Sequence, residues 1–418
     1  MGDIRGKEED IQNSKYNGIS CSRMSSGTID TRDLQLNALL EVTQAVNNNL
    51  PEEDLLKIYR FSLLADLKVQ KLALFTEEEN VWKCRAHFGT KVKMEQQVLP
   101  EQFLKLETEE KIKHKDFQEF DNVFPVRHKK KLLAVVFVSN SALEGNQNRF
   151  LNALTNIILV AIENKRLARK QVEQEAYKRE LEIAKKVQNF LFPKELPKIE
   201  RLQLEAFYLP HYDVGGDYYD YLQIDQDRFM ICIADVSGKG VPAALLMSNF
   251  QASLRSLVRQ TQDLEEIVKE LNITTYNSGN AENFITFFAG IYDFRSKRLE
   301  YINCGHNEIL LQTDNRVDLL TEGTTVLGMI NPLPFITSAH VEGLSAFSIF
   351  AYTDGLTETF NDDGEPFELD RLIALIQKEN HDDLAKLQAT ILDSLEDFKG
   401  DQKFHDDITM LSCKVVNT

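Results

Sequence analysis

The clearest pattern in the chain is a run of apolar residues that ends directly in an aspartate. Residues 229–234 carry apolar or weakly polar side chains, and Asp235 follows them. Six such residues bounded by a turn predict a buried strand. The two glycines of residues 237–240 predict the turn, and Pro242 stands where the first turn of a helix tolerates proline. We therefore expect Asp235 at the carboxyl end of a buried strand, where a carboxylate is rarely tolerated unless it is paired or binds a metal.

The same arrangement recurs in the second half of the chain. The further aspartates are Asp217 after a pair of glycines, Asp354 after the apolar run 346–352, and Asp406 with Asp407 before the strand-like run 410–416. Oxygen ligands without histidine or cysteine favour Mg²⁺ or Mn²⁺ over zinc. The pattern predicts that these side chains converge on a site for such a cation. Asp213 and Asp220 lie near Asp217 and are weaker candidates.

The first half of the chain shows helices followed by strands. Residues 1–30 contain almost no large apolar side chains, and we expect them to be disordered. Apolar residues at helical spacing run from Leu34 to Leu64. Strands are predicted at 71–75, 81–86, 122–127 and 132–138, and a closing helix at about 147–166.

One long helix is predicted from Asn152 to Phe192, because this stretch contains no glycine or proline before Pro193. Its apolar positions step by three and four residues, which indicates a short and weak coiled coil. Beyond it, helices are predicted at 241–261 and 264–271 and strands at 299–302 and 309–312.

Length, charge and cysteine content favour a cytoplasmic protein of two or three domains. A chain of 418 residues predicts two or three domains, and a net charge of −17 opposes binding to nucleic acid or to an anionic membrane. Five cysteines without a CxxC pair favour a reducing cytoplasm. No apolar run approaches the roughly 18–20 residues that span a bilayer, and the N-terminus has no signal-peptide core. We expect a cytoplasmic protein.

Five sequence blocks follow one another in the order typical of one family. They are VGGDYYD, ADVSGKGVPAALLM, INCGHN, AYTDGLTET and HDDITML, which lie between residues 214 and 411. Together they resemble the SpoIIE/RsbU type of bacterial serine phosphatase, in the metal-dependent protein phosphatase (PPM) superfamily. The resemblance covers about residues 179–416. It implies an α+β fold in which two antiparallel sheets form an α-β-β-α sandwich with metals at one edge.

The resemblance also assigns roles to single residues. Asp235 resembles the carboxylate that bridges two divalent metals, and the carbonyl of Val236 takes the place of a backbone ligand. The other positions are Asp217 on the side of one metal, Asp354 and Asp406 on the other, and Asp407 as either a neighbour of the ligands or an alternative ligand. Two such cations, Mn²⁺ or Mg²⁺, can share a hydroxide derived from water, so that no side-chain nucleophile is required.

Two further residues have alternative interpretations. His306 can be a general acid near the leaving oxygen, or it can belong to a turn between the strands at 299–302 and 309–312. Glycine and asparagine beside it favour the turn. Lys239 can approach a phosphate or simply be solvated, and its Gly-Lys-Gly context favours solvation.

The sequence therefore predicts a metal-dependent protein serine/threonine phosphatase. The alternative is an inactive scaffold that binds a phosphoprotein, and the presence of all four metal-type aspartates argues against it. The resemblance implies that the substrate is a phosphoserine on a regulatory protein, an anti-anti-sigma factor with a STAS domain.

The order of helices and strands in the first half resembles a GAF domain, which can bind a small molecule or serve in dimerisation. We predict a GAF-like sensor at residues 31–157, a helical linker at 158–192 and the phosphatase domain at 193–418. A homodimer is expected through the sensor and the linker.

Overall fold

The computed structural model describes residues 31–65, 68–78, 81–128, 131–139, 145–278, 283–313, 316–378 and 383–416. The predicted disordered segment at residues 1–30 lies outside them. The chain divides into two compact units, Met1–Glu173 and Gln174–Thr418. The division falls inside helix α4 (Gly145–Asn189). No helix in the described part of the chain is both long and apolar enough to cross a bilayer.

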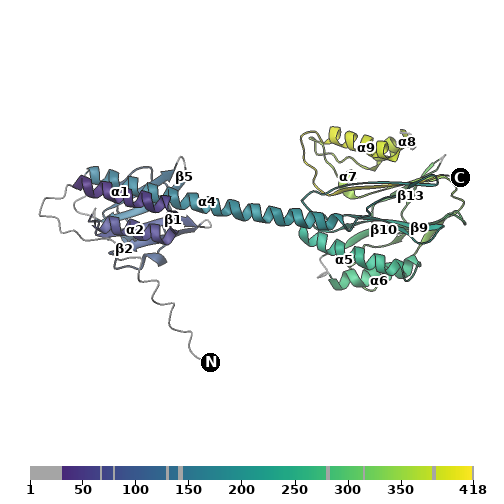
Figure 1. Cartoon of the computed structure of the whole chain (residues 1–418), viewed down its shortest axis with the longest axis horizontal. Coiled ribbons are helices and arrows are strands. Elements are labelled where there is room, and N and C mark those ends of the chain that lie inside the picture. Colours follow the sequence, from purple (N-terminus) through teal and green to yellow (C-terminus); the bar gives the residue numbers. More distant parts are fainter. Residues whose placement is uncertain are drawn as a thin grey trace, which may run out of the picture. The chain divides into compact units, whose positions relative to one another are not determined.

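The first unit contains a five-stranded antiparallel sheet with the strand order β2-β1-β5-β4-β3. Its strands are β1 (Lys71–Glu78), β2 (Val81–Phe88), β3 (Glu110–Lys111), β4 (Asn122–His128) and β5 (Lys131–Ser139). One face is covered by α1 (Thr31–Asn47), α2 (Glu52–Ala65) and the beginning of α4 (Figure 1). Val42, Leu55 and Leu154 bring the three helices into one apolar core with the sheet.

The other face of this sheet is covered by the segment between β2 and β4. The segment contains the short helices η1 (Met94–Gln96), α3 (Glu101–Leu104) and η2 (Lys115–Phe117), none of which the sequence pattern predicted. Buried phenylalanines fill the space beneath it, and the rings of Phe117 and Phe137 stack with centroids 4.3 Å apart. Aromatic packing of this kind stabilises the short segment against the sheet.

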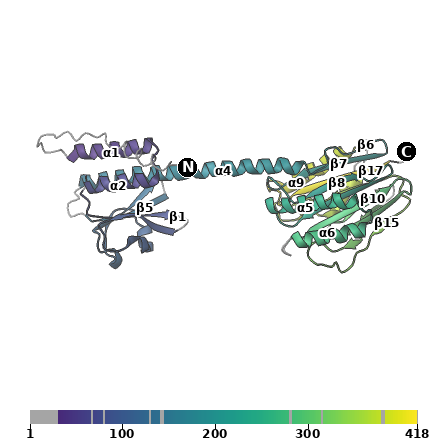
Figure 2. The same cartoon turned by 60° about the horizontal axis from the view of Figure 1, so that its bottom comes forward.

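The second unit is a sandwich of two sheets with helices on both outer faces (Figures 1 and 2). The first sheet has the order β14-β11-β10-β9-β8, with β15 on β11, and the second has the order β13-β12-β16-β17-β7-β6. The strands of the first sheet are β8 (Tyr218–Gln223), β9 (Arg228–Val236), β10 (Ile285–Asp293), β11 (Arg298–Cys304), β14 (Gly323–Thr324) and β15 (Ala339–Val341). Those of the second are β6 (Lys198–Ile199), β7 (Leu202–Leu209), β12 (Ile309–Thr313), β13 (Arg316–Leu320), β16 (Phe347–Tyr352) and β17 (Ile408–Val415).

The outer helices bury their apolar faces on these sheets. Helices α5 (Val241–Val258) and α6 (Leu264–Ser278) pack on the first sheet, and α8 (Leu369–Lys378) and α9 (Leu384–Lys399) pack on the second. The short helix α7 (Asp354–Thr357) follows β16. The predicted α+β fold with an α-β-β-α sandwich is confirmed.

Strand β9 shows why the apolar run is continuous. Phe229, Ile231 and Ile233 face the core between the two sheets, and the alternating residues Met230, Cys232 and Ala234 face α5 and α6. Successive side chains of a strand point to opposite faces, so a strand buried on both faces must be apolar at every position. Packing on both faces therefore holds β9 in place, and Asp235 lies near the end of this strand.

Helix α4 differs from its prediction at both ends. It begins at Gly145 rather than Asn152, and it ends at Asn189 rather than Phe192. The earlier end has a packing reason, because Phe192 leaves the helix to pack its ring against those of Tyr208 and Tyr219.

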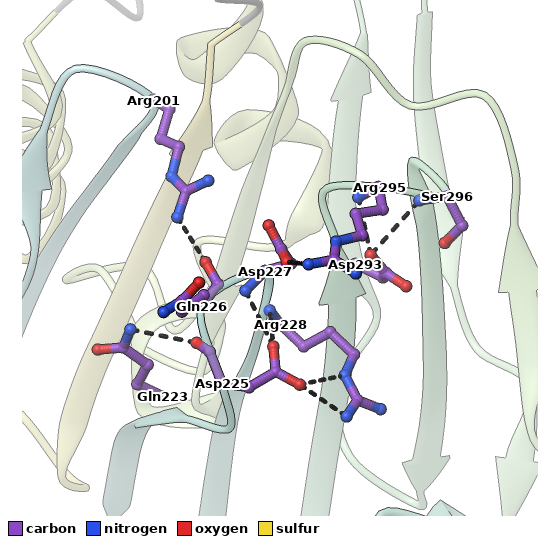
Figure 3. Close-up of polar contacts among 9 residues, drawn as sticks. All are labelled: Arg201, Gln223, Asp225, Gln226, Asp227, Arg228, Asp293, Arg295 and Ser296. Carbon is purple, nitrogen blue, oxygen red and sulfur yellow. Dashed lines mark hydrogen bonds and ion pairs between the residues drawn. The ribbon is translucent and has the colours of Figure 1, made fainter.

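Polar turns close the end of the sandwich at which β9 begins and β10 ends (Figure 3). Asp225 accepts hydrogen bonds from the backbone N–H groups of Asp227 and Arg228 at 2.9 Å, and its carboxylate pairs with the Arg228 guanidinium. Asp227 pairs in turn with Arg295 of the next hairpin. Arg201 donates a hydrogen bond to the carbonyl of Gln226 at 2.6 Å. These contacts support the register of the strands, which decides where their opposite ends meet.

Candidate metal centre

The register of the first sheet brings two of the predicted aspartates together. Tyr218 of β8 pairs with Ala234 of β9 in an antiparallel ladder. Asp217 and Asp235 are the next residues along each strand, so they lie opposite one another at the edge of the sheet. Residues opposite each other in such a ladder are neighbours in space. The predicted convergence of these two carboxylates is therefore a consequence of strand pairing.

Asp217 is deeply buried, with 1% of its surface exposed. Its Oδ2 accepts hydrogen bonds from the hydroxyl groups of Thr353 at 2.8 Å and Thr409 at 2.5 Å. Its Oδ1 is also buried and has no hydrogen-bond partner among the described residues. Burial and the nearby charge of Asp235 raise the pKa of Asp217 well above its usual value. One carboxylate oxygen is therefore held while the other is left without a partner.

The carboxyl groups of Asp235 and Asp354 also have raised pKa values. Burial, followed by the charge of Asp354, raises the pKa of Asp235 to about 7. Burial, followed by the charges of Glu358 and Asp406, raises the pKa of Asp354 to about 6. Both shifts mean that the carboxylates disfavour ionisation together unless a positive charge is added.

The adjacent residues Asp406 and Asp407 make different contacts. The carboxylate of Asp407 accepts backbone N–H groups of His211 and Gly216, both at 2.7 Å, and so holds the loop that leads into Asp217. Asp406 forms an ion pair with Lys239, with 2.6 Å between Oδ2 and Nζ. Lys239, which the sequence predicted to be solvated, is thus bound to one of the predicted metal ligands while remaining partly exposed.

The glycines before Asp217 are required by close approach of the chain. A Cβ atom on Gly216 would lie 2.7 Å from the carbonyl oxygen of Val236, and one on Gly215 would lie 2.2 Å from Oδ2 of Asp407. Any larger residue would push these groups apart. Glycine therefore allows the Val236 carbonyl, the predicted backbone ligand, to lie beside the loop of Asp217.

His306 is held by the protein on both sides of its ring. Its Nε2 lies 3.1 Å from the carbonyl oxygen of Tyr352, and its Nδ1 lies 2.7 Å from Oγ1 of Thr286. Since a carbonyl can only accept, Nε2 carries the proton, and Nδ1 accepts from the threonine hydroxyl. Burial lowers the pKa of His306 to about 4, so the ring is neutral at pH 7. These contacts join β10 of one sheet to β16 of the other and favour the structural interpretation over the general acid.

We expect His306→Gln to lose less than about tenfold in turnover, since a neutral ring with both nitrogens engaged is not a ready proton donor. The pH–rate profile of this variant should keep the shape of the wild-type profile. Steady-state rates between pH 5 and 9 measure both. A loss of about 10²-fold or more, together with a missing limb in the profile, would instead identify His306 as an acid in the reaction.

Comparisons with known proteins match this arrangement to one family. The family described as Stage II sporulation protein E (SpoIIE) matches residues 225–416. The phosphoserine phosphatase RsbU of Bacillus subtilis is 31% identical over 241 residues, which cover 57% of this chain and 70% of RsbU. The chain belongs to the SpoIIE family of serine phosphatases. The resemblance inferred from the five sequence blocks is confirmed.

Other relatives agree with this assignment. The phosphoserine phosphatase RsbP of Bacillus subtilis is 28% identical over 224 residues, which cover 52% of this chain but only 53% of RsbP. The SiaA-PP2C domain of Pseudomonas aeruginosa superimposes with a TM-score of 0.52 at 20% identity, covering 57% of this chain and 97% of that domain. The last similarity shows that the fold is of the PP2C type.

Phosphatases of the SpoIIE family are metal-dependent, and the residues of this chain fit a divalent cation. Among the described residues no three Asp, Glu, His or Cys side chains form a ready-made ligand cluster. The available donors are nevertheless all oxygens, as Mn²⁺ and Mg²⁺ prefer. The buried, unpartnered Oδ1 of Asp217 next to Asp235 is the decisive observation, because a buried polar atom without a partner is costly unless a ligand satisfies it.

The two weaker candidates, Asp213 and Asp220, have different surroundings. Asp213 is exposed on the loop before Asp217. Asp220 is fully buried and bound by the Arg255 guanidinium, with 2.8 Å from Nε to Oδ2 and 3.0 Å from Nη2 to Oδ1. It ties β8 to α5 and has its charge already compensated.

Three residues of the site were missed in the sequence. Thr353 and Thr409 bind Asp217, and Gln188 near the end of α4 binds the backbone of Gly215 through both its amide oxygen and its amide nitrogen. The amide nitrogen of Gln188 lies 2.7 Å from the carbonyl oxygen of Gly215. Both threonines lie inside the sequence blocks AYTDGLTET and HDDITML, so their place beside the aspartates could have indicated a role at the site. Nothing in the helical pattern distinguishes Gln188 from its neighbours.

Proposed function

We propose that this serine phosphatase hydrolyses phosphoserine or phosphothreonine in a regulatory protein with the help of two divalent cations, Mn²⁺ or Mg²⁺. The observation that supports this best is the buried Asp217 carboxylate, which has one unpartnered oxygen opposite Asp235. Asp217, Asp235, Asp354, Asp406 and the carbonyl of Val236 would hold the cations. Bound there, divalent cations lower the pKa of water and neutralise charge on a phosphoryl group.

The residues of the chain itself prepare the site. Asp407 fixes the loop before Asp217 through two backbone N–H groups. Lys239 is partly exposed and pairs with Asp406, so it places a positive charge beside one of the proposed ligands. Asp217 is buried and Asp235 and Asp354 are half-buried, and the lower dielectric there strengthens their attraction for cations. An inactive scaffold would have no need for this concentration of carboxylates around a buried Asp217.

The direct test is release of phosphate from a phosphoserine protein by the purified full chain. We expect release with Mn²⁺ or Mg²⁺, none after chelation, and recovery when the metal is restored. Binding of the phosphoprotein without release at any metal concentration would favour the scaffold.

The proposed substrate class is a phosphorylated anti-anti-sigma protein with a STAS domain. The resemblance of the sequence blocks to the SpoIIE/RsbU type implies this class, and the names of RsbU and RsbP, both phosphoserine phosphatases, support phosphoserine as the target residue. Phosphorylated STAS proteins of the host should therefore be dephosphorylated faster than unrelated phosphoserine proteins. Absence of release from every STAS protein would direct the search to another phosphoprotein.

The first unit is proposed to be a GAF-like module that supports dimerisation. Buried phenylalanines fill one face of its sheet, which leaves little room there for a small molecule. An open cleft of about 460 Å³ on the helical side, whose lining includes Leu74, Arg85 and Arg166, is the alternative place for a small-molecule ligand. A cytoplasmic location completes the proposal, supported by the four cysteines of the described residues, which form no disulfide.

Helix α4 is proposed to couple this module to catalysis. Its first turns pack in the core of the first unit through Leu154 and Ile158, and Gln188 in its last turn binds the loop of Asp217. A rotation of the helix would therefore change the loop that carries a metal ligand. Dimerisation or a ligand would then shift the balance between two arrangements through its different affinity for each.

Insertion of two residues after Gln174 tests this coupling. The insertion rotates one end of α4 relative to the other by about 200° and leaves both cores intact. We expect changed basal activity, measured as phosphate release, whereas insertion of seven residues, close to two full turns, should restore it in part. Unchanged activity and dimerisation after the two-residue insertion would mean that α4 is a passive spacer.

A further inference from the structure

Asp217 owes its orientation to two buried threonines from the opposite sheet. We propose that Thr353 and Thr409 are positioning residues for the cation site, because their hydroxyl groups hold Oδ2 of Asp217 and leave Oδ1 for the cation. This inference rests on the proposed metal-dependent function. It concerns residues that act through Asp217 and that do not touch the cation themselves.

The hydrogen bonds around these threonines determine which atom each hydroxyl donates its hydrogen to. The backbone N–H of Thr409 donates to Oγ1 of Thr353 at 2.9 Å. That hydroxyl therefore uses its own hydrogen for Asp217, at 2.8 Å. The Thr409 hydroxyl donates to the same carboxylate oxygen at 2.5 Å. Since a hydroxyl has only one hydrogen, both donors are committed to Oδ2, and neither is free to satisfy Oδ1.

Asp217 and the two threonines come from opposite sheets of the sandwich. Asp217 precedes β8 of the first sheet, whereas Thr353 follows β16 and Thr409 lies in β17 of the second sheet. Both threonines are fully buried, so their hydroxyl groups do not contact bulk water. These hydrogen bonds thus hold Asp217, a proposed metal ligand beside the first sheet, against residues of the second sheet.

The same two segments also carry the predicted ligands of the other cation. Thr353 precedes Asp354, and Thr409 follows Asp406 by three residues. Each of these two sequence blocks would supply one cation ligand and one positioning hydroxyl. A second group that orients a metal ligand typically changes metal affinity by about 10- to 100-fold when it is removed.

Thr409→Val is the cleanest test, because valine keeps the shape of threonine and removes only the hydroxyl that binds Asp217. We expect the dissociation constant for Mn²⁺, measured by calorimetry on the full chain without substrate, to rise by about tenfold or more. Turnover at subsaturating Mn²⁺ should fall together with the affinity. Thr409→Ser, which keeps the hydroxyl, should restore most of the affinity.

Controls separate this inference from the proposed function and from general destabilisation. Thr324→Val removes a buried hydroxyl that binds the carbonyl of Phe335, and it should leave Mn²⁺ binding unchanged. Asp217→Asn should weaken Mn²⁺ binding whatever the threonines do, so wild-type binding in that variant would overturn the metal site itself. If Asp217→Asn binds weakly and Thr409→Val binds normally, the positioning role is wrong.

Equal weakening in Thr409→Val and Thr409→Ser would also overturn the proposal, because packing rather than the hydroxyl would then be responsible. If Thr409→Val does not fold, Thr409→Ala compared with Thr409→Ser gives the same contrast with less bulk. Thermal unfolding of each variant without metal identifies the folded ones.

Discussion

Asp235→Asn should lower turnover and Mn²⁺ affinity together, by at least about 10²-fold, as expected for a lost metal ligand. The same change should leave the metal-free protein equally stable or more stable. Burial and the charge of Asp354 already disfavour the ionised form of Asp235, so a neutral side chain relieves repulsion. Phosphate release as a function of Mn²⁺ and thermal unfolding in chelator measure the two effects.

A loss of activity without a loss of metal-free stability distinguishes an aspartate that binds metal from one that supports the fold. Asp354→Asn should behave in the same way. Asp318→Asn in β13, whose half-buried side chain pairs with the exposed Arg316, should change activity not at all and stability very little. Full activity of Asp235→Asn at modest Mn²⁺ would contradict the assignment of the site. A large fall in the stability of the metal-free variant would show instead that Asp235 holds the fold.

Arg255→Met should destabilise the phosphatase unit by about 3–5 kcal/mol, because it leaves a buried charge without its partner. Asp220 is fully buried, and the guanidinium of Arg255 binds both of its oxygens. Asp220→Asn should cost less, since the Arg255 side chain is 35% exposed and can turn toward water. Urea unfolding followed by circular dichroism and by activity gives the change in the free energy of unfolding.

The surface pair of Arg228 and Asp225 provides the matched control. Both side chains are more than a third exposed, so Arg228→Gln should leave the free energy of unfolding close to that of the wild type. A similar cost for Arg255→Met and Arg228→Gln would show that the buried pair contributes little beyond an exposed one. A greater cost for Asp220→Asn than for Arg255→Met would contradict the expected asymmetry.

The sequence by itself determined the elements whose pattern is unambiguous. The unbroken apolar run at 229–234 predicted a buried strand, and β9 is that strand, buried on both faces. The predicted strands at 71–75 and 132–138 fall within β1 and β5. Burial on one or two faces imposes a period on the side chains, and that period can be read without the fold.

Other elements carried a weaker signal. Helix α8 was not predicted, although Leu372 and Ile376 lie four residues apart and are both buried. The segment between β2 and β4 was also missed, because its elements are only two to four residues long and show no period. Short elements are specified by what they pack against, and here that is the sheet face with Phe75 and Phe137.

At the site, the sequence determined which aspartates stand at strand ends, while the tertiary structure decided what each one contacts. Asp217 and Asp220 are three residues apart, yet one has an unpartnered oxygen and the other is bound by Arg255. The bonds from Asp217 to Thr353 and Thr409 span 136 and 192 residues of sequence. Contacts of that range depend on how the two sheets stack, and no local period of apolar and polar residues encodes that stacking.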